Sequence, residues 1–545
     1  MTLPRTDTDV LVAGGGLAGL TLARQLKRES PDLRVLVVEK RVHPVPEAAF
    51  KVGESSVEIG AHYFQKVLDL DSHLRAAHLE KLGLRYFFPH DDNRVLEQRV
   101  ELGPPTFPPV PSFQLDRGRL ENALTEMVRA AGVEVVENGA VRAVEIGGEQ
   151  HTAHITGPDG TCEARARWIV DATGRHGLLR RKFGLTREST HRANACWFRV
   201  STRLKIDDWV DDVRWQARVP GGQRWMSTVH MMGRGYWVWF IPLGNGSTSV
   251  GIVVDASLHD YSRLNRLDRA EAWLREFEPQ SADVVAAHRG QVEDFLALKE
   301  YAHGCERVYS PDRWALTGEA GVFTDPFYSP GSDFIALGNE CITDLILRDR
   351  AGEDIAARTE FFNTQYLRLF DAFIRLYDGQ YPIMGNAQVM TAKVAWDNVA
   401  YWGITAKLYF QRRYKRPEFM ESIGGLLRRF FVLHARMQTL FREWNARDAA
   451  HYEGAFVNVV DVESMRALQA DLSAPAMDDE SLRARLEANF VYLERVARTF
   501  QAMAAETDPA LTRFVPAGPG EGGLLDLTAL RLAPSLTSYG ANHQR

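Results

Sequence analysis

A glycine-rich turn and one acid near the start of the chain have the residue types and spacing that bind a dinucleotide. Gly14 allows a tight turn, Gly16 has no Cβ to block a pyrophosphate, and Gly19 lets a helix pack closely on a strand. The N-terminus of that helix would then face the anion. Glu39, twenty residues beyond Gly19, can accept hydrogen bonds from a ribose diol. These residues predict a dinucleotide-binding site.

The elements that must hold this site form one βαβ unit. A short apolar run, 10–13, precedes the turn, apolar residues then recur at helical spacing, and a second apolar run, 35–38, ends on the acid. Leu17 and Ala18 open the helix and Lys40 follows the acid. We therefore expect these three residues to lie beside the cofactor.

Two later glycine turns each follow a short apolar run and predict further contacts with the cofactor. Asp171 and Gly174 end the first run, and Gly318 and Glu319 follow the second. Because the parallel strands of such a sheet end at the edge where a dinucleotide binds, we place these four residues beside it. The helix that begins near Gly331 points the partial positive charge of its N-terminus at its neighbours, which suits a flavin edge or a small anion.

Lys81 lies at a junction between two apolar segments, a position where a lysine is usually solvated. Before it, Ser55 or Ser56 can cap a helical run. After it, Asp116 can cap a helix that starts at Arg117. We include Ser55 and Arg117 among the residues expected to bind the cofactor.

The chain as a whole is predicted to be an α/β protein of three parts. Residues 1–190 and 300–352 form the dinucleotide-binding domain, 191–299 an antiparallel β domain that holds substrate, and 353–545 a mostly helical region with a flexible break at 516–523. The middle part contains strand-like runs separated by glycine turns: 213–219, 224–231, 236–242 and 247–254. Its tryptophans could wall a site for a flat apolar substrate, although we expect most of them to be core residues.

Bulk properties exclude several classes of function. A net charge of −6 argues against nucleic acid as the main partner. The four cysteines are far apart and form no CxxC pair, so we expect reduced thiols, no disulfide and no metal site. The first strand begins too near Met1 to leave room for a signal peptide, and no apolar run is long enough to span a bilayer. A cytoplasmic protein is expected.

With its glycine turns in this order, the first 350 residues or so resemble the FAD-binding fold of the hydroxybenzoate-hydroxylase type, also called GR2-like. Within it, the segment Trp237-Val238-Trp239-Phe240-Ile241-Pro242 resembles the W-x-W-x-I-P signature of flavin-dependent halogenases. The Gly53-Glu54-Ser55 element and Lys81 are similar to those of the members that act on phenols and pyrroles.

This resemblance implies a reaction in two places. Reduced FAD and oxygen would oxidise a halide, chloride or bromide, to hypohalous acid, which then travels through a protein tunnel to an electron-rich aromatic ring. Lys81 would be the catalytic residue, because its ammonium can hydrogen-bond hypohalous acid and its neutral amine can form a haloamine. Trp237, Trp239, Ile241 and Pro242 would line the path between flavin and substrate.

Departures from the family pattern bear on substrate and halide. Tryptophan-acting members have a glutamate where this chain has Tyr328, and phenol-acting members an aromatic, which favours a phenol or a pyrrole. Tyr236 displaces the glycine that precedes the signature, and Glu319 stands where the family usually has Asp. Pro330 has no N–H for a halide, which weakens that inference, but Gly331 and Ser332 can still supply donors.

Two alternatives remain open from the sequence. One is a halide-independent flavin monooxygenase or dehydrogenase on the same scaffold, suggested by Pro330. The other is a non-catalytic flavin-binding protein that docks a carrier through the basic cluster at 407–416. Because no second glycine-rich unit for a nicotinamide is evident, a separate flavin reductase would supply reduced FAD. The aromatic substrate would be free or attached to an acyl or peptidyl carrier protein.

Overall fold

A mainly parallel sheet forms the first part of the chain in the computed structural model, which describes residues 6–47, 52–157, 160–515 and 523–535. Its order is β18-β19-β10-β1-β2-β7. The strands are β1 (Thr6–Ala13), β2 (Val35–Val38), β7 (Glu134–Val136), β10 (Gly160–Asp171), β18 (Tyr309–Ser310) and β19 (Trp314–Leu316). Ala13 is level with Val38 on one side and with Asp171 on the other, so the carboxyl ends of the central strands meet at one edge.

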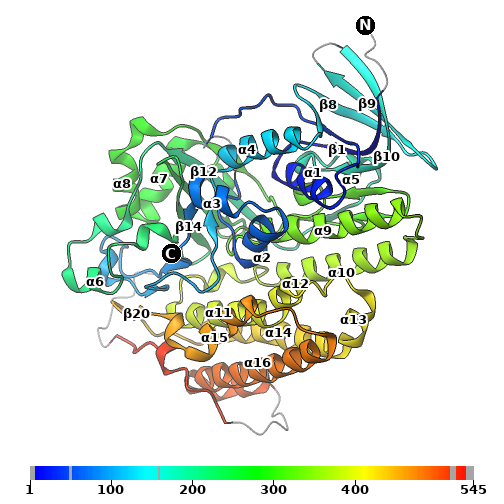
Figure 1. The fold of residues 1–545 in the computed structure, drawn as a ribbon. Helices are drawn as coiled ribbons and strands as arrows, with labels where there is room; N and C mark the ends of the chain where they lie inside the picture. Colours follow the sequence, from blue (N-terminus) through cyan, green and yellow to red (C-terminus); the bar gives the residue numbers. More distant parts are fainter. Residues whose placement is uncertain (1–5, 48–51, 158–159, 516–522, 536–545) are drawn as a thin grey trace.

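Helix α1 (Leu17–Glu29) joins β1 to β2 and confirms the predicted βαβ unit. It packs against α4 (Arg117–Ala130) and α9 (Gly331–Arg350). Asp116 caps α4 as predicted, because its side chain accepts the Arg119 N–H at 3.1 Å. A hairpin of β8 (Ala140–Glu145) and β9 (His151–Gly157) extends from β10 and projects from the molecule at the top of Figure 1.

The second sheet has the order β16-β12-β15-β14-β13-β4-β5-β20. Its strands come from three regions of the chain: β4 (Leu84–Phe87), β5 (Glu101–Leu102), β12 (Ala193–Val200), β13 (Thr228–Gly233), β14 (Tyr236–Pro242), β15 (Thr248–Asp255), β16 (Leu296–Leu298) and β20 (Phe456–Val457). All neighbours are antiparallel except β4 with β13 and β5 with β20. The sheet therefore ties residues of the first and last parts of the chain to the middle part.

One strand predicted in the middle part was wrong, and a second begins later than predicted. Residues 213–219 contain α6 (Val213–Ala217), because the Asp212 carboxylate accepts the N–H groups of Arg214 and Trp215 and starts a helix. Residues 224–231 begin with a 3₁₀ turn at Arg224–Met226 before β13. Two helices, α7 (Leu267–Phe277) and α8 (Pro279–Ala287), also lie in this part, on the left of Figure 1.

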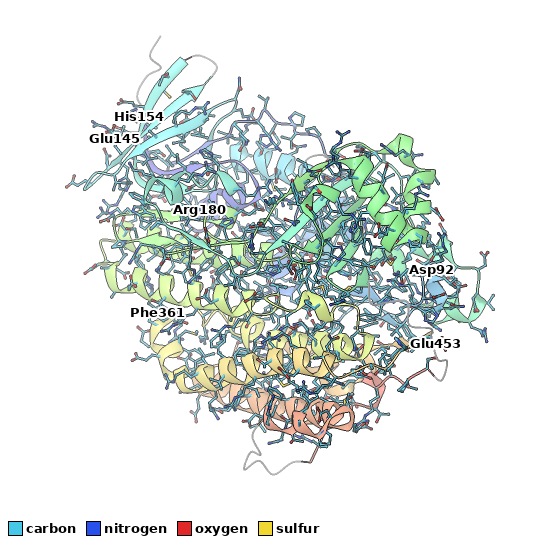
Figure 2. All side chains as sticks on the ribbon, turned by 180° about the vertical axis from the view of Figure 1, so that it is seen from behind. Asp92, Glu145, His154, Arg180, Phe361 and Glu453 are labelled. Atoms are coloured by element: carbon cyan, nitrogen blue, oxygen red, sulfur yellow. The ribbon has the colours of Figure 1, made fainter. Side chains whose placement is uncertain are left out.

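The last part is mostly helical, as predicted, and forms the lower layer of Figure 1. Its helices are α10 (Ala356–Ile374), α11 (Ala387–Ala400), α12 (Lys407–Phe410), α13 (Pro417–Ser422), α14 (Gly424–Asn445), α15 (Glu463–Ala470) and α16 (Asp479–Thr507). Phe361 of α10 contacts the cores on both sides of it and lies between the upper and lower layers in the reverse view (Figure 2). Most of the predicted break at 516–523 lies outside the described residues.

Short elements complete the fold: α2 (Glu58–His62), α3 (Asp71–Ala77), α5 (Leu178–Lys182), β3 (Leu79–Glu80), β6 (Phe113–Gln114), β11 (Thr186–Glu188) and β17 (His303–Cys305). Two π-helical turns, Tyr63–Val67 and Tyr401–Ala406, continue α2 and α11. The four cysteines are free. No helix among the described residues has the length and apolar character that crossing a bilayer requires, and those residues contain no cluster of three or more metal-binding side chains.

Candidate functional site

A cavity of about 780 Å³ lies at the carboxyl ends of the parallel strands. Most of the residues predicted to bind the cofactor line it: Gly14, Gly16, Leu17, Ala18, Glu39, Lys40, Ser55, Arg117, Gly174, Gly318, Glu319, Gly331 and Ser332. Trp237, Trp239 and Ile241 line it as well. We call it the cofactor cavity.

The glycines of the first turn differ in what they allow. Gly14 has a φ of +112°, and a Cβ there would lie 2.3 Å from the Ala172 carbonyl oxygen. A Cβ on Gly19 would lie 2.0 Å from the Gly14 oxygen, so this glycine serves helix packing and does not line the cavity. A Cβ on Gly16 would meet no protein atom within 4 Å. The open space at Gly16, beside the N-terminus of α1, fits a pyrophosphate.

Glu39 is held at the cavity wall by two backbone groups. Its Oε2 accepts the Gly15 N–H at 2.6 Å, and its Oε1 accepts the Arg41 N–H at 2.9 Å. Each carboxylate oxygen can accept more than one hydrogen bond, so acceptor capacity remains for the hydroxyls of a ribose. The residues present therefore fit the adenosine end of FAD.

Two predicted contacts are not part of this cavity. The buried Asp171 carboxylate accepts the hydroxyl of Thr173 at 2.7 Å and the N–H of Leu179 at 2.7 Å, so it stabilises its own turn. Ala172 to Gly174, which that turn positions, line the cavity instead. Pro242 lies at the end of β14 and is not a lining residue.

Substituting Gly16 with valine should weaken FAD binding at least about tenfold, because the new side chain fills space that no protein atom occupies. Unfolding of the FAD-free protein should be unchanged for the same reason. Titration of FAD by fluorescence, with thermal unfolding alongside, measures both. The matched control is Gly148→Val, an exposed glycine whose Cβ also meets nothing. Equal affinity in the two variants would contradict the assignment.

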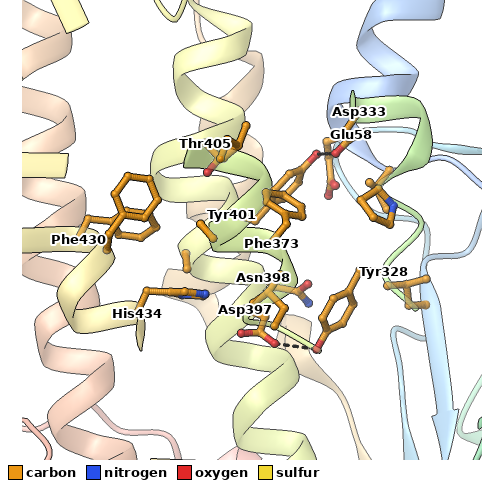
Figure 3. A pocket seen from close by; sticks show the side chains of 18 residues that line it. Glu58, Tyr328, Asp333, Phe373, Asp397, Asn398, Tyr401, Thr405, Phe430 and His434 are labelled. Carbon is orange, nitrogen blue, oxygen red and sulfur yellow. Dashed lines mark hydrogen bonds between the residues drawn. The ribbon is translucent and has the colours of Figure 1, made fainter. Parts of the chain in front are cut away.

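A second, smaller cavity of about 70 Å³ lies between the N-terminal part and the helical layer (Figure 3). Helices α10, α11 and α14 form one side, with Leu369, Phe373, Leu376, Phe430 and Phe431 among its apolar residues. Residues at the N-terminal ends of α2 and α9 form the other side, and Tyr328 lies here. The Tyr328 hydroxyl donates to Asp397 Oδ2 at 2.9 Å, which fixes the ring against the cavity.

Two segments pass between the cavities and contribute to both. Ser55 lines the cofactor cavity, whereas Val57 and Glu58 line the second one. Likewise Gly331 and Ser332 line the cofactor cavity, whereas Pro330 and Asp333 line the second one. A Cβ on Gly60 would lie 2.3 Å from Ser332 Oγ, so the two segments are in close contact. Together they form a partition.

Lys81 is buried within this partition. Only 1% of its surface is exposed, and its Nζ donates to Ser55 Oγ at 3.0 Å and to the Ser56 carbonyl at 2.7 Å. Burial lowers the Lys81 pKa to about 8, while the nearby negative charges of Glu58 and Asp333 act in the opposite direction. The amine therefore lies between residues of the cofactor cavity and residues of the second cavity, away from bulk water.

The two serines do not cap a helix, which corrects that expectation. The N-cap of α2 is Val57, and it makes no side-chain cap bond. Ser55 instead accepts from Lys81, and the Ser56 hydroxyl donates to the Phe113 carbonyl at 3.1 Å. The hydroxyls of Ser55 and Ser56 thus form hydrogen bonds with residues distant in sequence. The local sequence pattern had predicted that they would bind the N-terminus of the helix.

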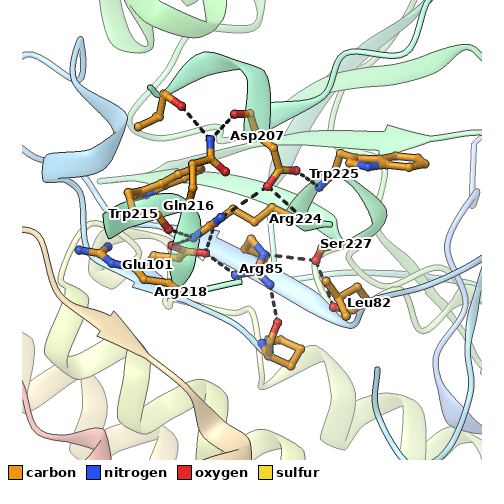
Figure 4. Close-up of polar contacts among 12 residues, drawn as sticks. Leu82, Arg85, Glu101, Asp207, Trp215, Gln216, Arg218, Arg224, Trp225 and Ser227 are labelled. Atoms are coloured by element: carbon orange, nitrogen blue, oxygen red, sulfur yellow. Dashed lines mark hydrogen bonds and ion pairs between the residues drawn. The ribbon is translucent and has the colours of Figure 1, made fainter. Parts of the chain in front are cut away.

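A buried network of charges fixes the chain directly after Lys81 (Figure 4). Arg85 and Arg224 both pair with the Glu101 carboxylate, and Arg224 also pairs with Asp207. Arg85 Nε donates to Ser227 Oγ at 3.3 Å, and that hydroxyl donates to the Leu82 carbonyl at 3.1 Å. Because Leu82 follows Lys81, the network holds the segment that leads from the amine into β4.

The tryptophan pair lies on the cofactor side of the partition. The two ring centroids are 5.6 Å apart, and neither ring lines the second cavity. Trp237 Nε1 donates to the Tyr381 hydroxyl at 3.0 Å, and Tyr381 donates to Asp325 Oδ2 at 2.6 Å. Trp239 Nε1 donates to Ser249 Oγ at 3.1 Å. These bonds set both rings as part of the cofactor cavity wall.

Sequence reasoning missed the polar residues of the second cavity. Glu58, Asp333, Asp397 and Tyr401 line it, although they come from four different elements. Two of them carried a local signal: Glu58 and Asp333 lie in the first turns of α2 and α9, a position that carboxylates favour next to a helix N-terminus.

Comparisons with known proteins agree with this geometry. A family model described as an FAD binding domain matches residues 7–272. The chain is 28% identical over 453 residues to the flavin-dependent halogenase chlA of Dictyostelium discoideum, covering 76% of this chain and 72% of that protein. It is 26% identical over 347 residues to a pyrrole-2-carbonyl peptidyl-carrier-protein chlorinase of Pseudomonas fluorescens, covering 60% and 72%.

Solved structures share the fold. Halogenase PltM superposes with a TM-score of 0.62 at 16% identity, over 88% of this chain and 96% of that one. The flavin-dependent brominase Bmp2 superposes with a TM-score of 0.54 at 22% identity, over 71% and 92%.

Proposed function

We propose that this chain, a member of the flavin-dependent halogenase family, uses reduced FAD, oxygen and chloride or bromide to halogenate a phenol or a pyrrole. The observation that carries the proposal is the placement of Lys81, whose amine is buried in the partition between two cavities. One cavity fits a dinucleotide and the other is lined by aromatic side chains.

Bound FAD, once reduced, would supply with oxygen the oxidising power that converts a halide ion into hypohalous acid. The residues of the chain would bind the halide and position the oxidant beside the substrate. The first N–H groups of α9 have no helical partner, and Ser332 Oγ is buried without a hydrogen-bond partner among the described residues. With Gly331, these donors face the cofactor cavity and suit a halide. Pro330, which lacks an N–H, lines the other cavity.

Lys81 would receive the oxidant from the cofactor side. Its ammonium can donate to the oxygen of hypohalous acid, and its neutral amine can form a haloamine. Either form holds an electrophilic halogen where the second cavity begins, so the ring and the halogen meet in a fixed orientation. The tryptophan pair would close the cofactor side against the substrate.

The second cavity limits the substrate to a small aromatic ring. About 70 Å³ has room for roughly five to seven water-sized groups, which is close to one substituted ring. Three of its lining residues, Glu58, Asp333 and Asp397, are acids, and the lining residues that the structure describes include no lysine or arginine. An uncharged phenol or pyrrole suits this wall better than an organic acid does. Among the relatives, one chlorinase is named for a carrier-bound pyrrole, and a PltM structure holds phloroglucinol and FAD. The ring would therefore arrive free or bound to a carrier.

The basic cluster at 407–416 gives little support to the alternative of a carrier-docking protein without catalysis. Lys407 is buried and pairs with Asp471 at 2.7 Å. Arg413 and Arg416 both pair with Asp479. Most of these charges are thus neutralised within the chain and do not form an open basic surface.

The test is an assay with FAD, a flavin reductase, NADH, oxygen, one halide and a panel of phenols and pyrroles. Mass spectrometry should detect a halogenated product only when chloride or bromide is present. Absence of product with every halide, although FAD binds and is reduced, would contradict the proposal. A hydroxylated product formed without halide would select the monooxygenase, the alternative that Pro330 suggested.

A bromide soak of FAD-loaded crystals checks the halide site separately. An anomalous peak is expected beside Gly331 and Ser332 in the cofactor cavity.

A further inference from the structure

Asp333 is a buried carboxyl group to which the proposed reaction assigns no role. Only 1% of its surface is exposed, and it lines the second cavity from the first turn of α9. Its Oδ1 accepts the Gly60 N–H at 2.8 Å, and its Oδ2 accepts the Tyr401 hydroxyl at 2.6 Å. These two hydrogen bonds hold the carboxyl group in one position at the cavity wall.

Titratable side chains from several neighbouring elements surround the Asp333 carboxyl group. Glu58 of α2 is the neighbouring anion and Lys81 the neighbouring cation. Glu58 Oε1 is already engaged, because it accepts from Trp402 Nε1 at 2.7 Å and from Gln469 Nε2 at 2.6 Å. Three tyrosine hydroxyls also interact electrostatically with the Asp333 carboxylate, which raises their pKa values: Tyr377, Tyr401 and Tyr409.

These surroundings place the titration of Asp333 near neutral pH. The Asp333 pKa is raised to about 7, chiefly by burial. The negative charge of Glu58 contributes to the rise, and the hydrogen bonds from Tyr401 and Gly60 and the charge of Lys81 oppose it. A carboxyl group with such a pKa can accept and release a proton under ordinary conditions.

We propose that Asp333 is the general base of the halogenation and accepts the proton that the aromatic ring loses. The inference rests on the proposed function, because it needs the ring in the second cavity and the electrophilic halogen at Lys81. Asp333 and Lys81 then act from the same partition on one ring.

The step balances without a further reagent. The new carbon–halogen bond forms with an electron pair of the ring while the oxygen–halogen bond of hypohalous acid breaks and leaves hydroxide. The ring carbon then loses its proton to the Asp333 carboxylate, and its C–H electron pair restores aromaticity. Asp333 passes the proton to the hydroxide, which becomes water. In the haloamine form, the nitrogen–halogen bond breaks instead and Asp333 returns the proton to the amine of Lys81.

Asp333→Asn tests the proposal because the amide is a much weaker base of nearly the same shape. Its oxygen can still accept the Gly60 N–H, and its NH2 group can donate to the Tyr401 hydroxyl. The turnover rate should fall about 10²–10⁴-fold, with little change in FAD affinity. In the wild type, the rate should rise with pH through about 7 as Asp333 loses its proton. That limb should be absent from Asp333→Asn. The limb of Lys81, near pH 8 in the wild type, should remain but move to lower pH, because the negative charge of Asp333 raises the Lys81 pKa.

Two matched variants should shift the rise of the rate near pH 7 in opposite directions, although both keep Asp333. Tyr401→Phe removes a hydrogen bond that favours the charged carboxylate, so the limb should move to higher pH. Glu58→Gln removes a neighbouring negative charge and keeps an acceptor for Trp402, so the limb should move to lower pH. A merely structural Asp333 predicts neither shift.

Each outcome decides the question. An Asp333→Asn variant with the wild-type rate and pH profile overturns the proposal. If that variant fails to fold, judged by FAD loading and thermal unfolding, the two matched variants decide, and an unmoved limb in both overturns it. A wild type that makes no halogenated product defeats the proposed function itself, which is a different result from a halogenase indifferent to Asp333.

Discussion

Replacing Lys81 with methionine should lower halogenation about 10²–10⁴-fold while FAD binding and oxygen consumption continue. The variant loses the amine that we propose to hold the electrophilic halogen, but the cofactor cavity, which Lys81 does not line, is unchanged. Methionine fills a similar volume. It removes the desolvation cost of a buried ammonium, which offsets the loss of the two hydrogen bonds to Ser55 and Ser56. The fold should therefore survive.

The experiment compares product formation with the release of free hypohalous acid, detected by a small diffusible scavenger. Oxidant that no longer reaches the ring should appear in solution. Lys66→Met, at an exposed lysine on the turn after α2, is the control and should behave as wild type. A Lys81→Met variant that halogenates at the wild-type rate would remove the amine from the mechanism.

Glu101→Gln should lower the free energy of unfolding by about 3–5 kcal/mol, the usual cost of leaving buried charges without their partner. Glu101 is fully buried and is the shared partner of Arg85 and Arg224. After the change, Arg224 would keep the contact of its NH1 with Asp207 Oδ1 at 3.5 Å, and Arg85 would have no carboxylate partner among the described residues.

Urea denaturation measures this effect, and Glu126→Gln is the control because Glu126 pairs with Arg129 on the exposed face of α4. A shift of less than 1 kcal/mol, the range of surface pairs, would show that the network is not needed for stability. Below the unfolding transition, the variant should also halogenate more slowly, since the network fixes the strand that follows Lys81.

The cofactor half of the site was predictable because its signals are local. Gly14, Gly16 and Glu39 act through their own turn and the ends of their own strands, and the parallel register brings those ends together. The same reasoning placed Asp171 beside the cofactor. Its carboxylate instead accepts hydrogen bonds from the N–H groups of its own turn. The position of a residue was thus easier to predict than the direction of its side chain.

The substrate half was not predictable because it is assembled from distant segments. Asp333 and Tyr401 meet across 68 positions of sequence. Tyr401 lies on a π-helical turn, which no periodicity in the sequence marked. Lys81 could be singled out only by resemblance, because the burial that distinguishes it from a solvated lysine depends on Ser55 and Ser56 in another segment.

The two cavities are built by different layers of the fold, which has a practical consequence for engineering. The cofactor cavity lies at the edge of the parallel sheet, whereas the wall of the second cavity opposite Pro330 is formed by residues of α10, α11 and α14. A mutant library confined to the apolar faces of those three helices should retune which ring is accepted and leave flavin loading intact. Any exchange of the whole helical layer must retain Phe456 and Val457, because these residues complete the edge of the sheet that also carries the tryptophan pair.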